Sequence, residues 1–443
     1  MLKISRILHA GYLIESEKAK IAFDPLFETP FSVNCYAFPA VSFDYAAIRS
    51  LELDAVFISH FHDDHFSMES LDQLNRTTPI YMFTVFPELL DLIRELGFDK
   101  VFALSLDVPV QIKDILVTPR KALDENVDSL LQIQSQSLNI LNVVDSWIDD
   151  ETLELLKNES PWDLVMWPFQ TMRELEMIAP TRHQSLPPEI PIEWRSQLET
   201  LQPKNLIPSS CQFKMEPWSW YNNYFFPISY EFFQKEVSRN LPLTNILRLN
   251  PGESLLIEPH GVRRADRLSW IKMEEDPQTD YIFDLRSPIP STLEVAQHFP
   301  VSDIERQRVL DFCNFELTKS YEKLKYDSHD YFLEDGVWEL NIFEPEREHR
   351  LLFHFFEGAM VICEGSEAPV FWKTEIPLKK LYGALESGES LSSLYIRINA
   401  QKFSEKHERR LKDVEVTEDP LLRVLYQDSL GSYQRAQLLR IKV

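Results

Sequence analysis

The feature that most constrains this chain is a six-residue cluster, His60-Phe-His62-Asp63-Asp64-His65, at the end of an apolar run. The run, residues 54–59, is short and bounded by polar residues, which predicts a buried strand. The cluster then lies in the loop at the carboxyl end of that strand. Open α/β sheets place their ligand sites at this position, so we expect an α/β fold with its site there.

The spacing within the cluster predicts a metal site. His60 and His62 are two residues apart in an extended segment, so both imidazoles project to one side and can hold one ion. Asp64 and His65 follow where the chain turns and can face a second ion. Histidine with carboxylate suits zinc, iron or manganese, whereas calcium requires oxygen ligands. Only 11 of 443 residues are histidine, so a chance polar surface loop is the weaker interpretation.

Charge and glycine content exclude several classes of function. The net charge of −25 argues against nucleic-acid binding and against adhesion to anionic membranes, because both depend on Lys and Arg. The chain has 10 glycines and neither a GxGxxG nor a GxxxxGK[ST] pattern. P-loop nucleotide hydrolysis and Rossmann redox chemistry are therefore disfavoured. We expect a small-molecule substrate, with no nucleic-acid or membrane partner.

Several further features predict a cytoplasmic protein. No apolar stretch approaches the ~18 residues that a membrane helix needs. The first residues have no secretory signal pattern. The four cysteines have no paired spacing, which disfavours both a disulfide framework and a CxxC metal site.

The order of the predicted elements indicates two domains. Strands followed by helices and then strands again suggest two facing sheets with helices outside, an αββα sandwich, over residues 1–275. A Pro-rich segment at 276–290 marks the boundary. Residues 291–443 are expected to form a separate α+β domain that ends in a helix over 420–439. That domain could cover the cleft, bind substrate or form a homodimer.

Several motifs in this order resemble the metallo-β-lactamase fold superfamily. The matching segments are His9-Ala-Gly-Tyr-Leu-Ile, Phe23-Asp24-Pro25, His60-x-His62-x-Asp64-His65 and Ile140-Leu-Asn-Val-Val-Asp145. Within that superfamily the chain is most similar to the subgroup of CMP-N-acetylneuraminate hydroxylases and their bacterial relatives. The supporting segments are Asp128-Ser-Leu-Leu, Leu201-Gln-Pro-Lys and Leu394-Tyr-Ile-Arg.

The resemblance implies roles for residues outside the cluster. Asp145 would be a metal-bridging aspartate. Asp24 would accept hydrogen bonds that orient residues 60–65, which we call the metal loop. The alternative is an aspartate that only forms a turn. His9 would approach the cleft or else serve as a structural histidine. His183 lies in a Pro-bracketed loop that would contact substrate or simply lie on the surface.

Three departures from the family pattern bear on the chemistry. The histidine expected just before Asp128 is missing, and Asp124 is the nearest substitute by position. The last family histidine is also missing, and Cys211 stands in that region, either as a ligand or, as we favour, as a buried inert thiol. Third, the hydroxylases carry a Rieske iron–sulfur module that needs two Cys and two His, and no such set is found here.

The first function expected is a metal-dependent hydrolase in which a metal-activated water is the nucleophile. His60, His62 and Asp124 would hold one ion, Asp64 and His65 the other, and Asp145 would bridge them. Asp64 would act as general base if only one ion is bound.

The second function is a diiron oxygenase that activates dioxygen and takes electrons from an external reductase. Zinc or iron, as one or two ions, is the expected cofactor in either reading. A non-catalytic relative is the third possibility, because two of the family histidines are absent.

Overall fold

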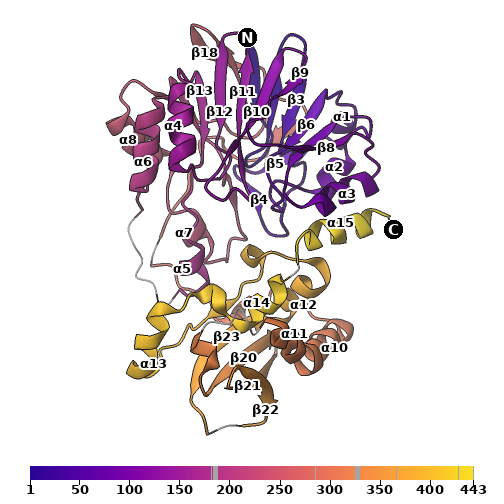
Figure 1. Ribbon diagram of the computed structural model, residues 1–443, viewed down its shortest axis with the longest axis vertical. Helices are drawn as coiled ribbons and strands as arrows, with labels where there is room; N and C mark the ends of the chain where they lie inside the picture. Colours follow the sequence, from indigo (N-terminus) through magenta and orange to yellow (C-terminus); the bar gives the residue numbers. More distant parts are fainter. Residues whose placement is uncertain are drawn as a thin grey trace.

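The computed structural model consists of a larger amino-terminal body and a smaller carboxy-terminal one, joined at a narrower waist (Figure 1). It describes residues 1–180, 182, 188–284, 286–324, 330–365, 367–427 and 429–442. The larger body runs through the last short strand at Ile271–Met273, and the smaller one begins with a helix at Thr292–Ala296. The predicted domain limits at residues 275 and 291 fall in the segment between these two elements.

Two large sheets face each other in the amino-terminal body. The first has the order β18-β17-β1-β2-β3-β6-β7-β8, and the second has the order β16-β14-β13-β12-β11-β10-β9. The strands of the first are β1 (Leu2–Arg6), β2 (Tyr12–Glu15), β3 (Lys20–Phe23), β6 (Ala55–Ile58), β7 (Ile80–Phe83), β8 (Val101–Leu104), β17 (Ser254–Glu258) and β18 (Gly261–Ala265). Those of the second are β9 (Val110–Ile112), β10 (Ile115–Lys121), β11 (Ser129–Ser135), β12 (Leu138–Asn142), β13 (Leu164–Trp167), β14 (Asn205–Pro208) and β16 (Asn245–Ile246).

An apolar layer fills the space between the sheets. It joins residues of the first sheet, such as Ile4 and Phe57, to residues of the second, such as Ile133 and Ile140, all of them fully buried. Burying one inward face of each sheet is the main favourable term for such a sandwich. Helices cover much of the outer face of each sheet (Figure 1) and bury apolar side chains there.

Helices lie on both outer faces of the sandwich (Figure 1). One layer contains α1 (Tyr45–Arg49), α2 (Met68–Asp72) and α3 (Pro87–Glu95), and the other contains α4 (Asp150–Asn158), α6 (Ile192–Leu201) and α8 (Tyr230–Asn240). Two small sheets pair β4 (Tyr36–Ala37) with β15 (Phe213–Lys214), and β5 (Val41–Phe43) with β19 (Ile271–Met273). The αββα sandwich predicted from the sequence is confirmed.

The carboxy-terminal body is a five-stranded sheet with helices, the α+β arrangement that the sequence predicts. Its order is β22-β21-β20-β23-β24. The strands are β20 (Gly336–Glu344), β21 (Arg347–Phe356), β22 (Ala359–Cys363), β23 (Val370–Pro377) and β24 (Arg397–Ile398). Its helices are α9 (Thr292–Ala296), α10 (Asp303–Asp311), α11 (Leu317–Leu324), α12 (Leu378–Ser387), α13 (Glu405–Arg410), α14 (Pro420–Tyr426) and α15 (Ser432–Lys442).

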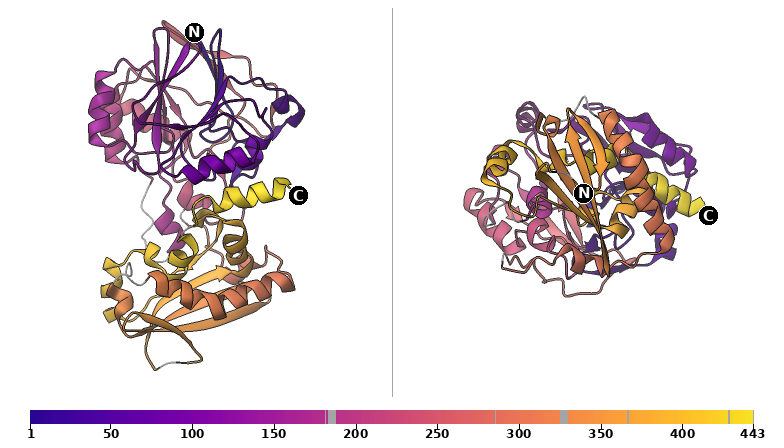
Figure 2. Two further views of the ribbon diagram at one scale, coloured as in Figure 1. Left: turned by 45° about the vertical axis from the view of Figure 1, so that its right-hand side comes forward. Right: turned by 90° about the horizontal axis from the view of Figure 1, so that it is seen from below.

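The prediction of one final helix over 420–439 is wrong. The structure has two helices, α14 and α15, separated by a turn that contains Gly431. Gly431 has a φ of +70°, a conformation that glycine adopts without strain, and a Cβ there would lie 2.8 Å from Leu89 of α3. The turn lets α15 leave the carboxy-terminal body and pack against α2 and α3 (Figure 2).

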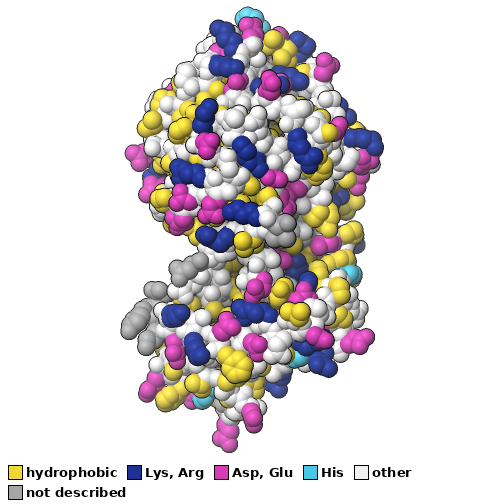
Figure 3. All heavy atoms as spheres, turned by 90° about the vertical axis from the view of Figure 1, so that its right-hand side faces the viewer, with side chains coloured by type: hydrophobic (Ala, Val, Ile, Leu, Met, Phe, Trp, Pro, Cys, Tyr) yellow, Lys and Arg dark blue, Asp and Glu magenta, His cyan; other side chains and the backbone are white. Residues whose placement is uncertain are grey.

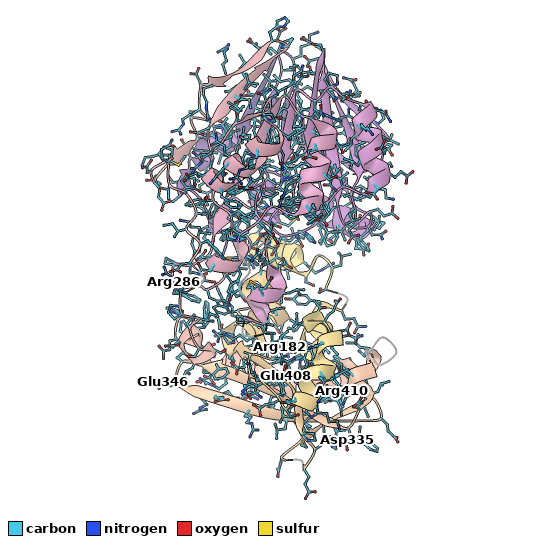
Figure 4. The ribbon with its side chains drawn as sticks, turned by 90° about the vertical axis from the view of Figure 1, so that its left-hand side faces the viewer. Arg182, Arg286, Asp335, Glu346, Glu408 and Arg410 are labelled. Carbon is cyan, nitrogen blue, oxygen red and sulfur yellow. The ribbon has the colours of Figure 1, made fainter. Side chains whose placement is uncertain are left out.

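Two short helices occupy the waist between the bodies, α5 (Glu174–Ile178) and α7 (Asn222–Phe225) (Figure 1). Nearby, Arg182 reaches from the amino-terminal body to α13, where its Nη1 donates to Glu408 Oε2 at 3.0 Å (Figure 4). The Arg182 Nε also donates to the Asn399 carbonyl at 3.0 Å. The two bodies are therefore tied together by polar contacts as well as by α15.

Two further features of the molecule are the distribution of charge on its surface and the apolar character of its helices. On the face drawn in Figure 3, Lys and Arg side chains are interspersed with Asp and Glu, without an extended basic area. Among the described residues, no helix has both the length and the apolar character that a membrane crossing requires.

We predict that Gln434 stabilises the fold through the loop that follows β6. Its Nε2 donates to the carbonyls of Phe61 and Phe66, each at 3.1 Å, from a side chain that is 3% exposed. Gln434→Ala leaves both carbonyls without this donor and should lower the free energy of unfolding by about 1–3 kcal/mol, measured by urea denaturation. Gln427→Ala, which removes an exposed side chain, is the control. Equal stabilities for the two variants would contradict the prediction.

Candidate metal centre

The polar cluster lies where the ends of four strands meet. In the first sheet β3 and β6 are parallel neighbours, so Asp24 and Ser59, which follow them, lie side by side. In the second sheet β11 and β12 are antiparallel, which brings Asp128, before β11, and Asp145, beyond β12, to one edge. The Ser129 hydroxyl donates to the Ser59 carbonyl at 2.9 Å and joins the two edges.

Asp24 holds the metal loop in position. Its carboxylate accepts the Ser59 N–H at 2.7 Å, the Ser59 hydroxyl at 2.6 Å and the Nδ1 of His65 at 3.1 Å. Asp24 is 1% exposed and has a φ of +39°, a left-handed conformation that aspartate tolerates better than most residues. Because the Nδ1–H of His65 points at Asp24, Nε2 is the nitrogen that can bind a metal once it has lost its proton. This is the place that the resemblance implied for Asp24.

The first group of potential ligands is His60, His62 and Asp128, whose ligand atoms all lie within 4.8 Å of one another. His60 Nε2 is 3.0 Å from His62 Nδ1 and 3.8 Å from Asp128 Oδ1. Burial, with the nearby His65 charge, lowers the pKa of His60 to about 4, so its imidazole is neutral at pH 7. Burial and the Asp145 charge raise the pKa of Asp128 to about 6.

The second group is His9, Asp64, His65 and Asp145. His65 Nε2 lies 3.0 Å from Asp145 Oδ2 and 3.1 Å from His9 Nε2. The other oxygen of Asp145, Oδ1, is 3.9 Å from His60 Nε2 in the first group. The Asp145 carboxylate therefore faces both groups, as a bridging ligand would.

His9 offers this group a hydrogen-bond donor. The Cys211 backbone N–H donates to His9 Nδ1 at 3.0 Å, so Nδ1 must be the acceptor. A neutral His9 then carries its proton on Nε2, which lies 3.2 Å from Asp64 Oδ2. The lone pairs left for a second ion belong to Asp64, His65 and Asp145. Of the two roles expected for His9, one in the cleft and one as a structural histidine, its Nε2 beside Asp64 fits the first.

The arrangement fits one or two divalent ions. Oδ1 of Asp128 and Oδ1 of Asp145 are buried and have no hydrogen-bond partner, which costs about 1–3 kcal/mol for each such atom. The pKa of His65 is held above its usual range despite its burial, because the Asp145 and Asp64 charges surround it. Cations at the two groups would satisfy the unpaired oxygens and offset the crowded carboxylates.

The structure corrects the position of one predicted ligand. Asp128, rather than Asp124, lies beside His60 and His62. Asp124 is exposed, and its carbonyl accepts the N–H groups of Val127 and Asp128, so it begins the turn that delivers Asp128 to the site. The signal available in the sequence was that Asp128 immediately precedes a strand, at the edge where Asp145 also lies.

The remaining candidates lie elsewhere or have other roles. His183 falls outside the described residues. The Cys211 thiol lies 3.0 Å from the Met172 sulfur, and burial raises its pKa well above the usual range. Cys211 is in neither group of potential ligands, and it contributes to the site through its backbone N–H. The other five predicted ligands, His60, His62, Asp64, His65 and Asp145, all lie in the two groups.

A cavity of about 420 Å³ opens onto this centre. Aromatic side chains form part of its wall, namely Trp147, Trp194 and Phe213. The segment Ser390–Ser392 of the carboxy-terminal body closes another side, and the Asn34 amide donates to the Ser392 carbonyl at 3.3 Å. Both bodies thus build the pocket.

Comparisons with known sequences match only part of the chain. No family model matches it. A Mycobacterium tuberculosis protein provisionally named a Rieske 2Fe-2S iron–sulfur protein is 29% identical over 104 residues, which are 23% of this chain and 20% of that protein. A protein of the same provisional name from Mycolicibacterium smegmatis is 29% identical over 133 residues, 29% of this chain and 24% of that protein. The chain thus spans about a quarter or less of these relatives.

Solved structures that resemble this chain include metallo-β-lactamase fold proteins, the superfamily that the motifs resemble. YhfI from Bacillus subtilis is 15% identical with a TM-score of 0.39, and it covers 57% of this chain and 99% of its own. An isothiocyanate hydrolase from Delia radicum gut bacteria is 14% identical (TM-score 0.42; 58% and 99%). CmlA, a diiron β-hydroxylase from Streptomyces venezuelae, is 13% identical (TM-score 0.40; 60% and 54%).

We predict that Asp24→Asn weakens metal binding by 10- to 100-fold. The amide nitrogen cannot accept the bonds from Ser59 and His65, so the metal loop loses its orientation. Calorimetric titration of the metal-free protein with Zn²⁺ or Co²⁺ measures the affinity. Asp44→Asn is the matched control, because an Asn at that exposed helix N-cap still accepts the same N–H groups. An affinity in Asp24→Asn equal to that of the control would contradict the assigned role.

Metal affinity should also fall as the pH is lowered through about 6. A carboxylate ligand must be deprotonated to bind, and the pKa of Asp128 is about 6 in the metal-free protein. Protonation of His65, whose pKa is raised, acts in the same direction. Titrations between pH 5 and 8 would show the loss, and the step near pH 6 should be smaller in Asp128→Asn. A constant affinity over this range would argue against Asp128 as a ligand.

Proposed function

We propose that this protein is a dinuclear metalloenzyme that oxidises a small organic molecule with dioxygen at two iron ions. The observation that carries this proposal is the placement of Asp128 with His60 and His62. Two histidines and one carboxylate with open positions are the ligand set typical of non-haem iron oxygenases. The second group adds one histidine, His65, and two carboxylates, Asp64 and Asp145, so oxygen donors equal nitrogen donors overall.

Each residue at the centre has a defined task in this proposal. Iron held there would supply the capacity to react with dioxygen. Asp145 faces both groups and would fix their separation. Asp24 sets the orientation of His65. His9 donates its Nε2–H towards Asp64, which holds that carboxylate in place.

The cavity supplies the substrate site. Trp147, Trp194 and Phe213 present apolar surface that would hold a small organic molecule beside the centre and exclude water from it. The volume of about 420 Å³ lies within the usual range for small-molecule sites.

An oxygenase of this kind consumes electrons. The curated relatives are named for a Rieske cluster, but they align with this chain over less than a third of its length. The four cysteines of this sequence show no paired Cys and His spacing for such a cluster. We therefore propose that an external reductase supplies the electrons.

Hydrolysis by a metal-activated water is the second candidate. The three imidazoles of His60, His62 and His65 are ligands that zinc shares with iron. With a single ion in the first group, Asp64 would be free to act as general base.

Metal content and oxygen uptake decide between these functions. Protein produced with added iron should retain about two iron ions per chain, show a visible absorption band and consume dioxygen after chemical reduction. Asp128→Asn should lose one iron and most of the oxygen uptake. Asp124→Asn, an exposed aspartate four residues away, should keep both and is the matched control.

Other outcomes would overturn the proposal. A protein that retains zinc in the presence of iron and hydrolyses esters or amides would be a hydrolase. Failure to retain any metal at near-stoichiometric amounts would indicate a non-catalytic relative.

A further inference from the structure

The pocket beside the metal centre is lined by acidic residues without any basic partner. Five carboxyl groups line it, and no Lys or Arg does among the described residues. The carboxyl groups are those of Asp63, Asp64, Asp128, Asp145 and Glu174. Pockets that bind phosphate or carboxylate groups use Arg, Lys or clustered backbone N–H groups for this purpose. This pocket is instead lined by negatively charged groups.

Metal binding would account for only part of this negative charge. Asp64, Asp128 and Asp145 belong to the two ligand groups, and two divalent ions exceed their charge by one. Asp63 and Glu174 lie outside the ligand groups and together exceed that surplus. With both ions bound, the pocket would still favour a positively charged molecule over a negatively charged one.

Asp63 is one of the two lining carboxylates outside the ligand groups. Its Oδ2 atom is buried and has no hydrogen-bond partner. Among the described residues, neither Asp63 nor Glu174 forms an ion pair with Lys, Arg or His. Asp63 lies between His62 and Asp64 in the chain and lines the pocket together with Ser390 of the carboxy-terminal body. A partly buried carboxylate without an ion-pair partner is stabilised by a cationic donor from a ligand.

The apolar wall suits the same kind of molecule. Trp147, Trp194 and Phe213 line the pocket that Asp63 and Glu174 share. Aromatic faces attract ammonium groups and also cover apolar surface. Aromatic side chains with nearby carboxylates are a combination that recognises organic cations.

We propose that the substrate carries an amine in its ammonium form and that Asp63, assisted by Glu174, binds this group. The inference rests on the proposed function because it names the substrate class of the same site. It separates this pocket from one for nucleotide sugars, the substrates named in the hydroxylase subgroup that the sequence resembles, since no Lys or Arg among the described lining residues would receive a phosphate away from the metal ions. The segment Ser390–Ser392 would then make the carboxy-terminal body part of the substrate site.

Three probes of nearly equal size test the charge preference. Benzylamine, benzyl alcohol and benzoate present a positive, a neutral and a negative group on the same ring. Ligand-observed NMR titrations at pH 7 with the metal-loaded full chain give the three affinities. Benzylamine should bind about tenfold more tightly than benzyl alcohol, because a charge-assisted hydrogen bond is stronger than a neutral one, and benzoate should bind most weakly.

Variants then locate the group responsible. Asp63→Asn should remove most of the preference for benzylamine over benzyl alcohol, and Glu174→Gln should reduce it, with the alcohol's affinity unchanged in both. Asp99→Asn, at an exposed position away from the pocket, should keep the full preference. Metal content is measured for each variant. If Asp63→Asn does not fold, Glu174→Gln and the wild-type preference still decide the question.

Equal binding of amine and alcohol, tightest binding of benzoate, or a preference unchanged in both variants would overturn the inference. Failure of the proposed function is a separate result. In that case the protein would hold zinc or consume no dioxygen while the amine preference persists. An iron protein without an amine preference would retain the proposed function and lose this inference.

Discussion

The candidate site depends on one buried carboxylate, Asp24, which joins the end of one strand to the loop after the next. By accepting both donors of Ser59 and the Nδ1–H of His65, it fixes the path of the chain between His60 and His65. The parallel pairing of β3 with β6 brings these residues together. Without that anchor, the Ser59 donors and the Nδ1–H of His65 would lose their buried acceptor. The contacts of Asp24 therefore both stabilise this part of the fold and orient the proposed metal ligand His65.

The sequence predicted those parts of the site that are local in the chain. The spacing of His60, His62, Asp64 and His65 is visible in one segment, and the buried strand before it fixes the direction of the loop. The choice of Asp128 over Asp124 depends on how a turn between two strands delivers its last residue, and that turn is positioned by a contact between Ser129 and Ser59 across the two sheets. The nitrogen on which His9 carries its proton depends on the backbone N–H of Cys211, some 200 residues away in the sequence. The spacing of residues around His9 cannot predict such a contact.

The sequence predicts the fold of the carboxy-terminal body but not its function. The way this body packs against the metal loop suggests a function. Its last helix, α15, is turned away by Gly431 and donates two hydrogen bonds to the metal loop through Gln434. The segment before β24 closes the pocket with Ser390–Ser392. The predicted unbroken final helix could not have reached the loop in this way. Because this body contacts the metal loop and lines the cavity, its residues would contact a bound substrate.

The central claim is that Asp128 and Asp145 complete a dinuclear centre in which His9 is a donor and not a ligand. A crystal structure of the iron-loaded protein, with anomalous scattering recorded at the iron edge, tests it most directly. The account predicts two iron peaks, one bonded to His60, His62 and Asp128 and the other to Asp64 and His65, with Asp145 between them and His9 hydrogen-bonded to Asp64. A single peak, an iron without Asp128 as a ligand, or His9 bonded to a metal through Nε2 would contradict it.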